Sequence, residues 1–208
     1  MHPTTAFALL AALSHPALAI PVSSSASAAD AASAASSPAI RFRARTSNPS
    51  NAVLHDQPIS AHSSYLAVRP DATTGCPGAV VPHCASYGNA TVLALDPGTA
   101  GAHLGLAAAV PGGQHVYVDP AGALRYTLAH SGHVVEGAVA SGFAYDAAAR
   151  ELRFQGKAAG GWADGFVVCE RQEGWLLFVK TDVVGENCVS VGIATVDAPA
   201  EAAAWQYT

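Results

Sequence analysis

The chain has 208 residues, a formal net charge of −5 and a charged fraction of 12%. It carries neither the basic stripe that predicts nucleic-acid binding nor a polybasic patch for anionic lipid, so we expect it to bind neither nucleic acid nor an anionic membrane surface. Its length allows one domain with a hydrophobic core.

The first residues predict a secretory signal peptide. The apolar run FALLAAL (Phe7–Leu13) is too short to span a bilayer, and it is followed by Pro16 and the small-residue cleavage pattern ALA (Ala17–Ala19). We therefore expect residues 1–19 to be removed on export. The alternative is an apolar helix of the mature protein.

Residues 20–39 form a low-complexity arm of serine and alanine, with no large apolar side chain after Val22. Such a segment buries too little surface to offset its ordering entropy, so we expect a flexible arm whose serines accept O-linked sugar, rather than an Ala-rich helix. The mature domain is then residues 40–208. It has no second apolar run of membrane-spanning length and no lipid-anchor signal, so no membrane anchor is expected.

Short β-type runs separated by turn signals follow along the whole domain. About a dozen strands of typical length are predicted, at residues 40–47, 52–61, 64–68, 90–96, 102–110, 114–119, 123–129, 142–146, 151–156, 165–170, 175–180 and 189–196. The fold class is therefore all-β, in a single compact domain. A weak threefold repeat of strand, Asp-containing turn and strand favours a β-trefoil-like fold or another small closed barrel, and a two-sheet β-sandwich is the alternative.

Four cysteines, Cys76, Cys84, Cys169 and Cys188, lie in the predicted mature chain. An even number in an oxidising compartment predicts disulfides, and three pairings are possible. We expect Cys76 to pair with Cys84 across a short proline-containing loop, and Cys169 with Cys188 across neighbouring strands. The Cys-x-x-Cys spacing typical of zinc and redox sites is missing.

Two further positions are candidates for contact with sugars. Asn89 opens the acceptor sequence Asn-Ala-Thr and is a predicted N-glycosylation site. Trp162 lies in GGWADG, a glycine-rich loop that would expose the indole for stacking on a sugar ring, whereas Trp175 starts an apolar run and is expected in the core.

No catalytic or metal-binding residues are predicted. His130 and His133 flank Ser-Gly, which predicts a turn rather than a shared helical face, so surface histidines are favoured over a metal site. Carboxylates that would suit a glycosidase by residue type alone are Asp146, Glu151, Asp164, Glu170, Glu173 and Asp182. No Gly-x-Ser-x-Gly or phosphate-loop motif is present, and no cofactor is expected.

The order of several segments resembles the fungal cell-wall protein family PhiA, some members of which are described as IgE-binding allergens. The matching segments are FRARTSN, LHDQPISAHSSYLAV, VYVDPAGALRYT, GFAYDAAARELRFQG, VVCE with GWLLFV, NCVSVGIATV and the final YT. The last third is also similar to the C-terminal domain of yeast-type wall mannoproteins. Cys169 and Cys188 match the family's hairpin cysteines, whereas Cys76 and the Ser/Ala arm depart from its pattern.

The resemblance implies a secreted, non-enzymatic structural protein of the cell wall, linked to the development of spore-bearing cells, with wall polysaccharide as its expected partner. A secreted carbohydrate-binding effector is the alternative, and a hydrolase with an unrecognised site is a third reading. The oligomeric state is left open.

Overall fold

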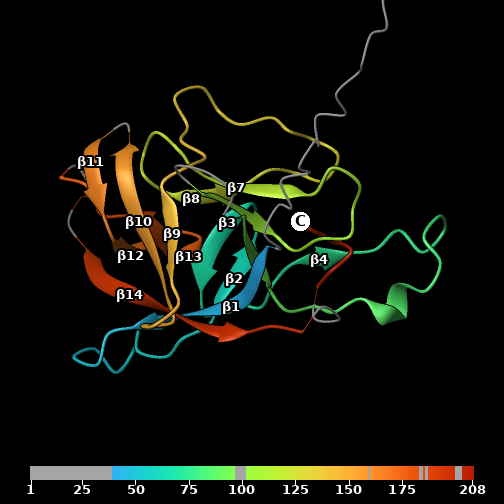
Figure 1. Ribbon diagram of the computed structural model, residues 1–208, viewed down its shortest axis with the longest axis horizontal. Coiled ribbons are helices and arrows are strands. Elements are labelled where there is room, and N and C mark those ends of the chain that lie inside the picture. Colours follow the sequence, from blue (N-terminus) through green and yellow to red (C-terminus); the bar gives the residue numbers. More distant parts are fainter. Residues whose placement is uncertain (1–38, 97–101, 159, 183–184, 186, 200–202) are drawn as a thin grey trace, which may run out of the picture. The chain divides into compact units, whose positions relative to one another are not determined.

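The computed structural model describes residues 39–96, 102–158, 160–182, 185, 187–199 and 203–208 (Figure 1). The predicted signal peptide and nearly all of the predicted arm lie outside these residues. Within them the chain forms strands and one short 3₁₀ turn, without an α-helix. The all-β prediction is therefore confirmed.

The strands and the turn follow one another along the chain as β1 (Ile40–Ser47), β2 (Ile59–His62), β3 (Tyr65–Val68), β4 (Thr74–Gly75), η1 (Cys84–Ser86), β5 (Leu93–Asp96), β6 (His103–Leu106), β7 (Gln114–Val118), β8 (Leu124–Tyr126), β9 (Phe143–Asp146), β10 (Glu151–Ala158), β11 (Gly161–Asp164), β12 (Phe166–Arg171), β13 (Gly174–Val179), β14 (Cys188–Asp197) and β15 (Gln206–Tyr207).

Most of these strands belong to one antiparallel sheet whose order closes on itself. Within the described residues, the order β1-β5-β6-β7-β8-β3-β13-β12-β14 returns to β1 through an additional β1–β14 pairing. β2 pairs with β3, whereas β9, β10 and β11 branch from β14 and stand together on the left of Figure 1. β4 and β15 form a separate two-stranded sheet.

β14 joins the ring to the branch. Its residues 188–191 pair with β12, and its residues 192–197 pair with β1. Ala194 and Ile193 also face Glu151 and Leu152 of β10. One long strand therefore serves three neighbours, and the β9–β10–β11 branch is held at that point.

The main core lies on the inner face of the ring. Strand β1 shows the alternation that produces it, because Phe42, Ala44 and Thr46 are buried while Arg41 and Arg43 are exposed. Neighbouring strands contribute further buried aliphatic and aromatic side chains, the largest of them Tyr126, Tyr207, Phe143 and Phe154. The alternation of polar and apolar residues along these strands thus places the apolar side chains in the core and the polar ones in solvent.

A second, smaller apolar cluster explains why two runs are apolar without alternation. In β12, Phe166 and Val168 pack in the main core, whereas Val167 and Cys169 pack in the second cluster. In β13, Leu177 belongs to the main core, and Leu176 and Phe178 belong to the second cluster. Both faces of these strands are therefore covered, which a continuous apolar run indicates.

One of the expected strands differs from the structure over half of its length. The strand predicted at residues 52–61 is wrong over its first half, because the amide groups of Val53 and Leu54 donate to the side chain of Asn51 and hold a turn. Leu54 is buried although it lies in that turn, so an apolar residue of the turn led to the prediction of a strand there. The sequence also did not predict β4, β11 or β15.

Candidate functional site

Trp162 lies on β11 with its side chain 65% exposed. The prediction of a loop at this position was wrong, because residues 161–164 pair with β10 and place Lys157 opposite Trp162. Gly161 has a φ of 111°, a conformation that glycine tolerates and that lets the chain reverse between the two strands. The indole is exposed as expected, but on a paired strand rather than a loop.

Other tryptophan and tyrosine side chains of the domain pack against neighbouring residues. Trp175 packs against the main core, and Tyr117 and Tyr126 are buried. Tyr145 stacks on Phe42 with a centroid separation of 5.7 Å. Among the aromatic side chains of the described residues, Trp162 is the one that is exposed.

Polar side chains accompany Trp162 on the outer face of the β10–β11 hairpin. Gln155 lies opposite Asp164, two register positions from the pair Lys157–Trp162, and all four side chains are exposed. Within the described part of the chain, none of these four side chains hydrogen-bonds or ion-pairs with another residue. The face therefore offers an apolar ring beside an amide, an ammonium and a carboxylate.

Sequence reasoning missed Gln155 and Lys157 as neighbours of Trp162. The sequence holds only a weak signal for this hairpin, the pair Gly160-Gly161 between two short polar-apolar alternations. The observed register pairs Ala158 with Gly161 and Lys157 with Trp162, which a turn placed at Gly160-Gly161 does not give, so the register itself could not be counted from the sequence.

Both expected disulfides are present. Cys76 and Cys84 are bonded across a loop whose Val80 is 77% exposed. Cys169 of β12 and Cys188 of β14 are bonded as directly opposite residues, with their Cα atoms 4.1 Å apart. Cys169 is fully buried in the second cluster, so this disulfide joins two strands of the ring at its outer face.

Asn89 is exposed ahead of β5. The hydroxyl of Thr91, the third residue of its acceptor sequence, accepts a hydrogen bond of 2.7 Å from the amide of Ala61. The side chain that would carry the sugar thus faces solvent, while its partner threonine is fixed to β2. Glycosylation here remains a prediction.

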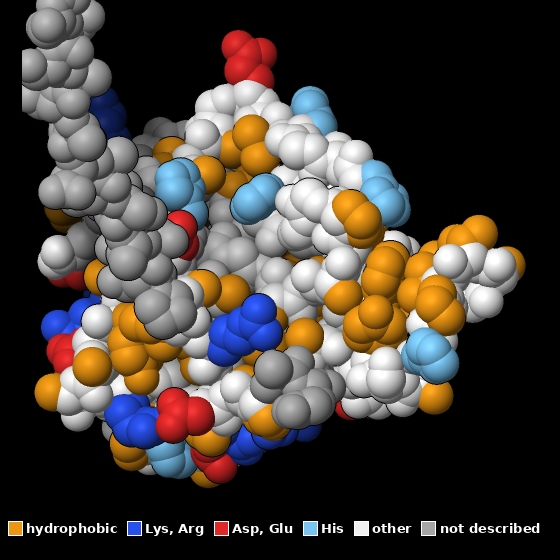
Figure 2. All heavy atoms as spheres, turned by 45° about the vertical axis from the view of Figure 1, so that its right-hand side comes forward, with side chains coloured by type: hydrophobic (Ala, Val, Ile, Leu, Met, Phe, Trp, Pro, Cys, Tyr) orange, Lys and Arg blue, Asp and Glu red, His pale blue; other side chains and the backbone are white. Residues whose placement is uncertain are grey.

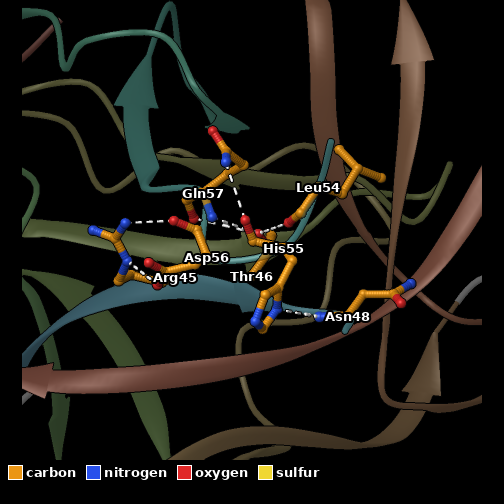
Figure 3. A network of polar contacts seen from close by, with 7 residues as sticks. All are labelled: Arg45, Thr46, Asn48, Leu54, His55, Asp56 and Gln57. Carbon is orange, nitrogen blue, oxygen red and sulfur yellow. Dashed lines mark hydrogen bonds and ion pairs between the residues drawn. The ribbon is translucent and has the colours of Figure 1, made fainter. Parts of the chain in front are cut away.

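The connection between β1 and β2 holds a dense network of polar contacts (Figure 3). Arg45 donates to the carboxylate and to the main-chain carbonyl of Asp56, and Thr46 donates to the carbonyl of Leu54. The hydrogen bond from Arg45 lowers the pKa of Asp56 below its usual value. These contacts join the two ends of a loop, and we assign them a structural role.

The histidines and carboxylates named above are dispersed. His130 and His133 are both exposed in the irregular segment between β8 and β9, and within the described ranges no three metal-ligating side chains come together. Asp146 accepts hydrogen bonds from the amides of Ala148 and Ala149 and pairs with Arg153 at 2.8 Å. The Ala149 amide, foremost among these contacts, lowers the pKa of Asp146, whereas a general acid needs a raised one.

On the face seen in Figure 2, acidic and basic side chains are interspersed with apolar and histidine side chains. The described part of the chain contains no helix of the length and hydrophobicity needed to cross a membrane.

Comparison with known proteins gives two matches. A family model described as PhiA-like secreted protein matches residues 42–208. An uncharacterized secreted protein of Arthroderma benhamiae is 33% identical over 150 residues, which is 65% of this chain and 69% of that protein. No solved structure matches.

Proposed function

Because the chain belongs to the PhiA-like secreted protein family, we propose that it is a non-enzymatic structural protein of the fungal cell wall. Weak contacts with wall polysaccharide hold it in the glycan matrix, and a sugar chain on Asn89 adds to them. The resemblance to PhiA extends the proposal to walls of developing spore-bearing cells.

The exposed indole of Trp162 is the observation that carries the proposal. A large apolar ring in water costs free energy, and stacking on the C–H face of a pyranose removes that surface from solvent. The ring sits on a paired strand beside exposed polar groups, so little ordering entropy is lost when a sugar binds. Each contact is weak, and a protein that dissociates meets further sugar units of the matrix and binds again.

Two disulfides and a closed strand order support a role outside the cell. Each disulfide stabilises a folded chain by roughly 2–4 kcal/mol, chiefly by restricting the unfolded state. A protein that remains in a wall after export has no chaperones around it and benefits from such restriction.

Fractionation of the source culture tests the proposal. An antibody against residues 40–208 is used to probe the medium, a hot-detergent extract of the wall and the stripped wall residue. We expect the protein in the wall fractions. Protein found in the medium alone would contradict a structural role in the wall.

The same exposed Trp162 favours a second candidate, a secreted carbohydrate-binding effector that acts on a host or competitor. The two candidates differ in where the protein stays and in whether a soluble oligosaccharide binds it specifically. Turnover of a glycan or peptide by the purified protein would instead support a hydrolase and oppose both.

A further inference from the structure

A groove runs beside the β10–β11 hairpin and continues past it. One hollow of about 560 Å³ is lined by Arg153, Gln155, Asp164 and Gly192 among others. A second hollow of about 370 Å³ extends towards Asn48 and Lys180. The two hollows share the segment Asp164–Phe166 and the pair Val191–Gly192, so they adjoin along these residues, and together they are called the hairpin groove.

The hairpin groove follows from the strand order. β12 and β10 meet β14 at successive positions, through Val191 and Ile193, whereas β11 is paired with β10 alone within the described residues. The chain passes from β11 to β12 at Gly165, where φ is +85°. Gly165 and Gly192 line both hollows, and neither has a side chain that would occupy them.

The rim of the hairpin groove carries groups suited to hydroxyls. Gln155 and Asp164 lie opposite each other, and both side chains are free of partners within the described residues. A planar amide offers donors and acceptors side by side, and a carboxylate accepts from two neighbouring hydroxyls. Arg153 differs, because it already pairs with Asp146 and Glu151.

Trp162 lies beyond the end of this rim on the same face. Residues two apart on a strand are separated by roughly 7 Å, so the indole follows Asp164 at about the spacing of consecutive sugar units. The hollows are lined by two acidic side chains, Glu151 and Asp164, and two basic ones, Arg153 and Lys180, so their charges balance and give no preference for an anion. Lys157 stands beside Trp162, outside the hollows.

We propose that Trp162 and the hairpin groove form one extended site for a neutral polysaccharide chain, with one pyranose on the indole and the following units in the groove. This inference rests on the proposed function and names its ligand class. Because the two hollows adjoin along shared residues, the site has room for several consecutive sugar units.

Binding of the purified secreted protein to β-1,3-glucan and chitin oligosaccharides of increasing length, with polygalacturonate as the anionic comparison, tests the inference by calorimetry. Trp162→Ala removes the ring. Gly192→Val adds a side chain at a residue that lines both hollows. A Cβ there meets its nearest atom, the Cβ of Ser47, at 3.5 Å, an ordinary contact that the fold tolerates. Gln155→Ala removes a rim group without touching the fold, and Leu128→Ala, at an exposed apolar residue elsewhere, is the matched control.

We expect affinity for one neutral series to rise with chain length, to fall by about tenfold or more in Trp162→Ala and Gly192→Val, and to be unchanged in Leu128→Ala. Wild-type affinity in both Gly192→Val and Gln155→Ala would overturn the groove, as would equal affinity for polygalacturonate. A protein that is held in the wall but binds neither series also overturns the inference, while the wall proposal stands. If the protein binds an oligosaccharide series but is absent from the wall, the inference about the site stands and the wall proposal fails.

Discussion

The side chain of Gln114 pairs with the backbone of Tyr207 as a neighbouring strand would. Its Nε2 donates to the Tyr207 carbonyl at 2.9 Å, and its Oε1 accepts from the Tyr207 amide at 2.7 Å. The same Nε2 also donates to the carbonyl of Thr127. Gln114 and Tyr207 are both 1% exposed, so one buried amide satisfies three backbone groups.

Replacing this amide by a hydrocarbon of similar size is expected to destabilise the domain strongly. Gln114→Leu fills the same space but leaves the three backbone groups without partners, so the free energy of unfolding should fall by about 2–4 kcal/mol. Urea unfolding measures the change. Gln155→Leu, at an exposed glutamine, should stay within about 0.5 kcal/mol of the wild type, and an equal loss in both variants would contradict the role of Gln114.

Two buried tyrosines predict a loss of stability at high pH. Burial raises the pKa of Tyr126 and of Tyr207, so the folded state favours the protonated phenols. Their contribution is complete below the usual tyrosine pKa of about 10 and is lost as the pH rises through the raised values. The Tyr207 hydroxyl donates to the Ala90 carbonyl and accepts from the Val92 amide, contacts that its ionisation would disturb.

Denaturant unfolding at a series of alkaline pH values checks this dependence. Tyr207→Phe should unfold more easily at neutral pH, by about 1 kcal/mol for the lost hydrogen bonds, and should show a shallower fall above pH about 10. An unchanged alkaline slope in this variant would assign the dependence to other groups.

An exposed ion pair predicts acid sensitivity of the β1–β2 connection. The hydrogen bond from Arg45 lowers the pKa of Asp56 from 3.8, so its stabilisation is present above that value and is lost as the pH falls through the lowered folded value. Asp56→Asn and Arg45→Gln should each reduce the acid dependence of unfolding, and the double variant should add nothing further. Because both side chains are exposed, added salt should weaken the effect.

The two disulfides should differ in their accessibility to reductant. Cys76 and Cys84 are half-buried, whereas Cys169 is fully buried against β13. Mild reductant in native buffer should therefore open Cys76–Cys84 first, as followed by alkylation and peptide mass analysis. Loss of the Cys169–Cys188 bond should cost about 3 kcal/mol or more, because it also disturbs the second cluster. Prior reduction of Cys169–Cys188 would contradict the order.

Exposure of Asn89 predicts that the secreted protein carries an N-linked sugar there. Asn89→Gln should remove the mobility shift that an N-glycosidase produces, and Ser50→Ala should leave it, because Asn48 is followed by proline. Persistence of the shift in Asn89→Gln would place the sugar elsewhere.

The sequence predicted the elements whose signals are local. Strand β1 was placed at its observed bounds because polar and apolar residues alternate along it, and both disulfides were placed because each pair brackets a loop or hairpin. Strand β11 gave too weak a signal, because its four residues include one glycine and one alanine. The turn at Asn51 was missed because Leu54 supplies core packing from outside a strand.

Long-range relationships could not be predicted in the same way. The β1–β14 pairing joins Ser47 to Gly192, and no local pattern specifies a partner so distant in sequence. For the candidate site, the residue type identified Trp162. The positions of Gln155 and Asp164 beside it depend on the register of the β10–β11 hairpin. Such a relation is a property of the assembled sheet.

Closure of the strand order also bears on how copies of the protein behave when crowded. Open sheets leave rows of unpaired amide and carbonyl groups at their edges, where another chain can add as a further strand. In the ring, β1 and β14 are the first and last strands of the order, and they pair with each other, for example at Thr46 and Ile193. Their backbone amide and carbonyl groups are therefore not left open along this edge. Copies of the protein at high concentration are thereby protected from edge-to-edge aggregation along the ring.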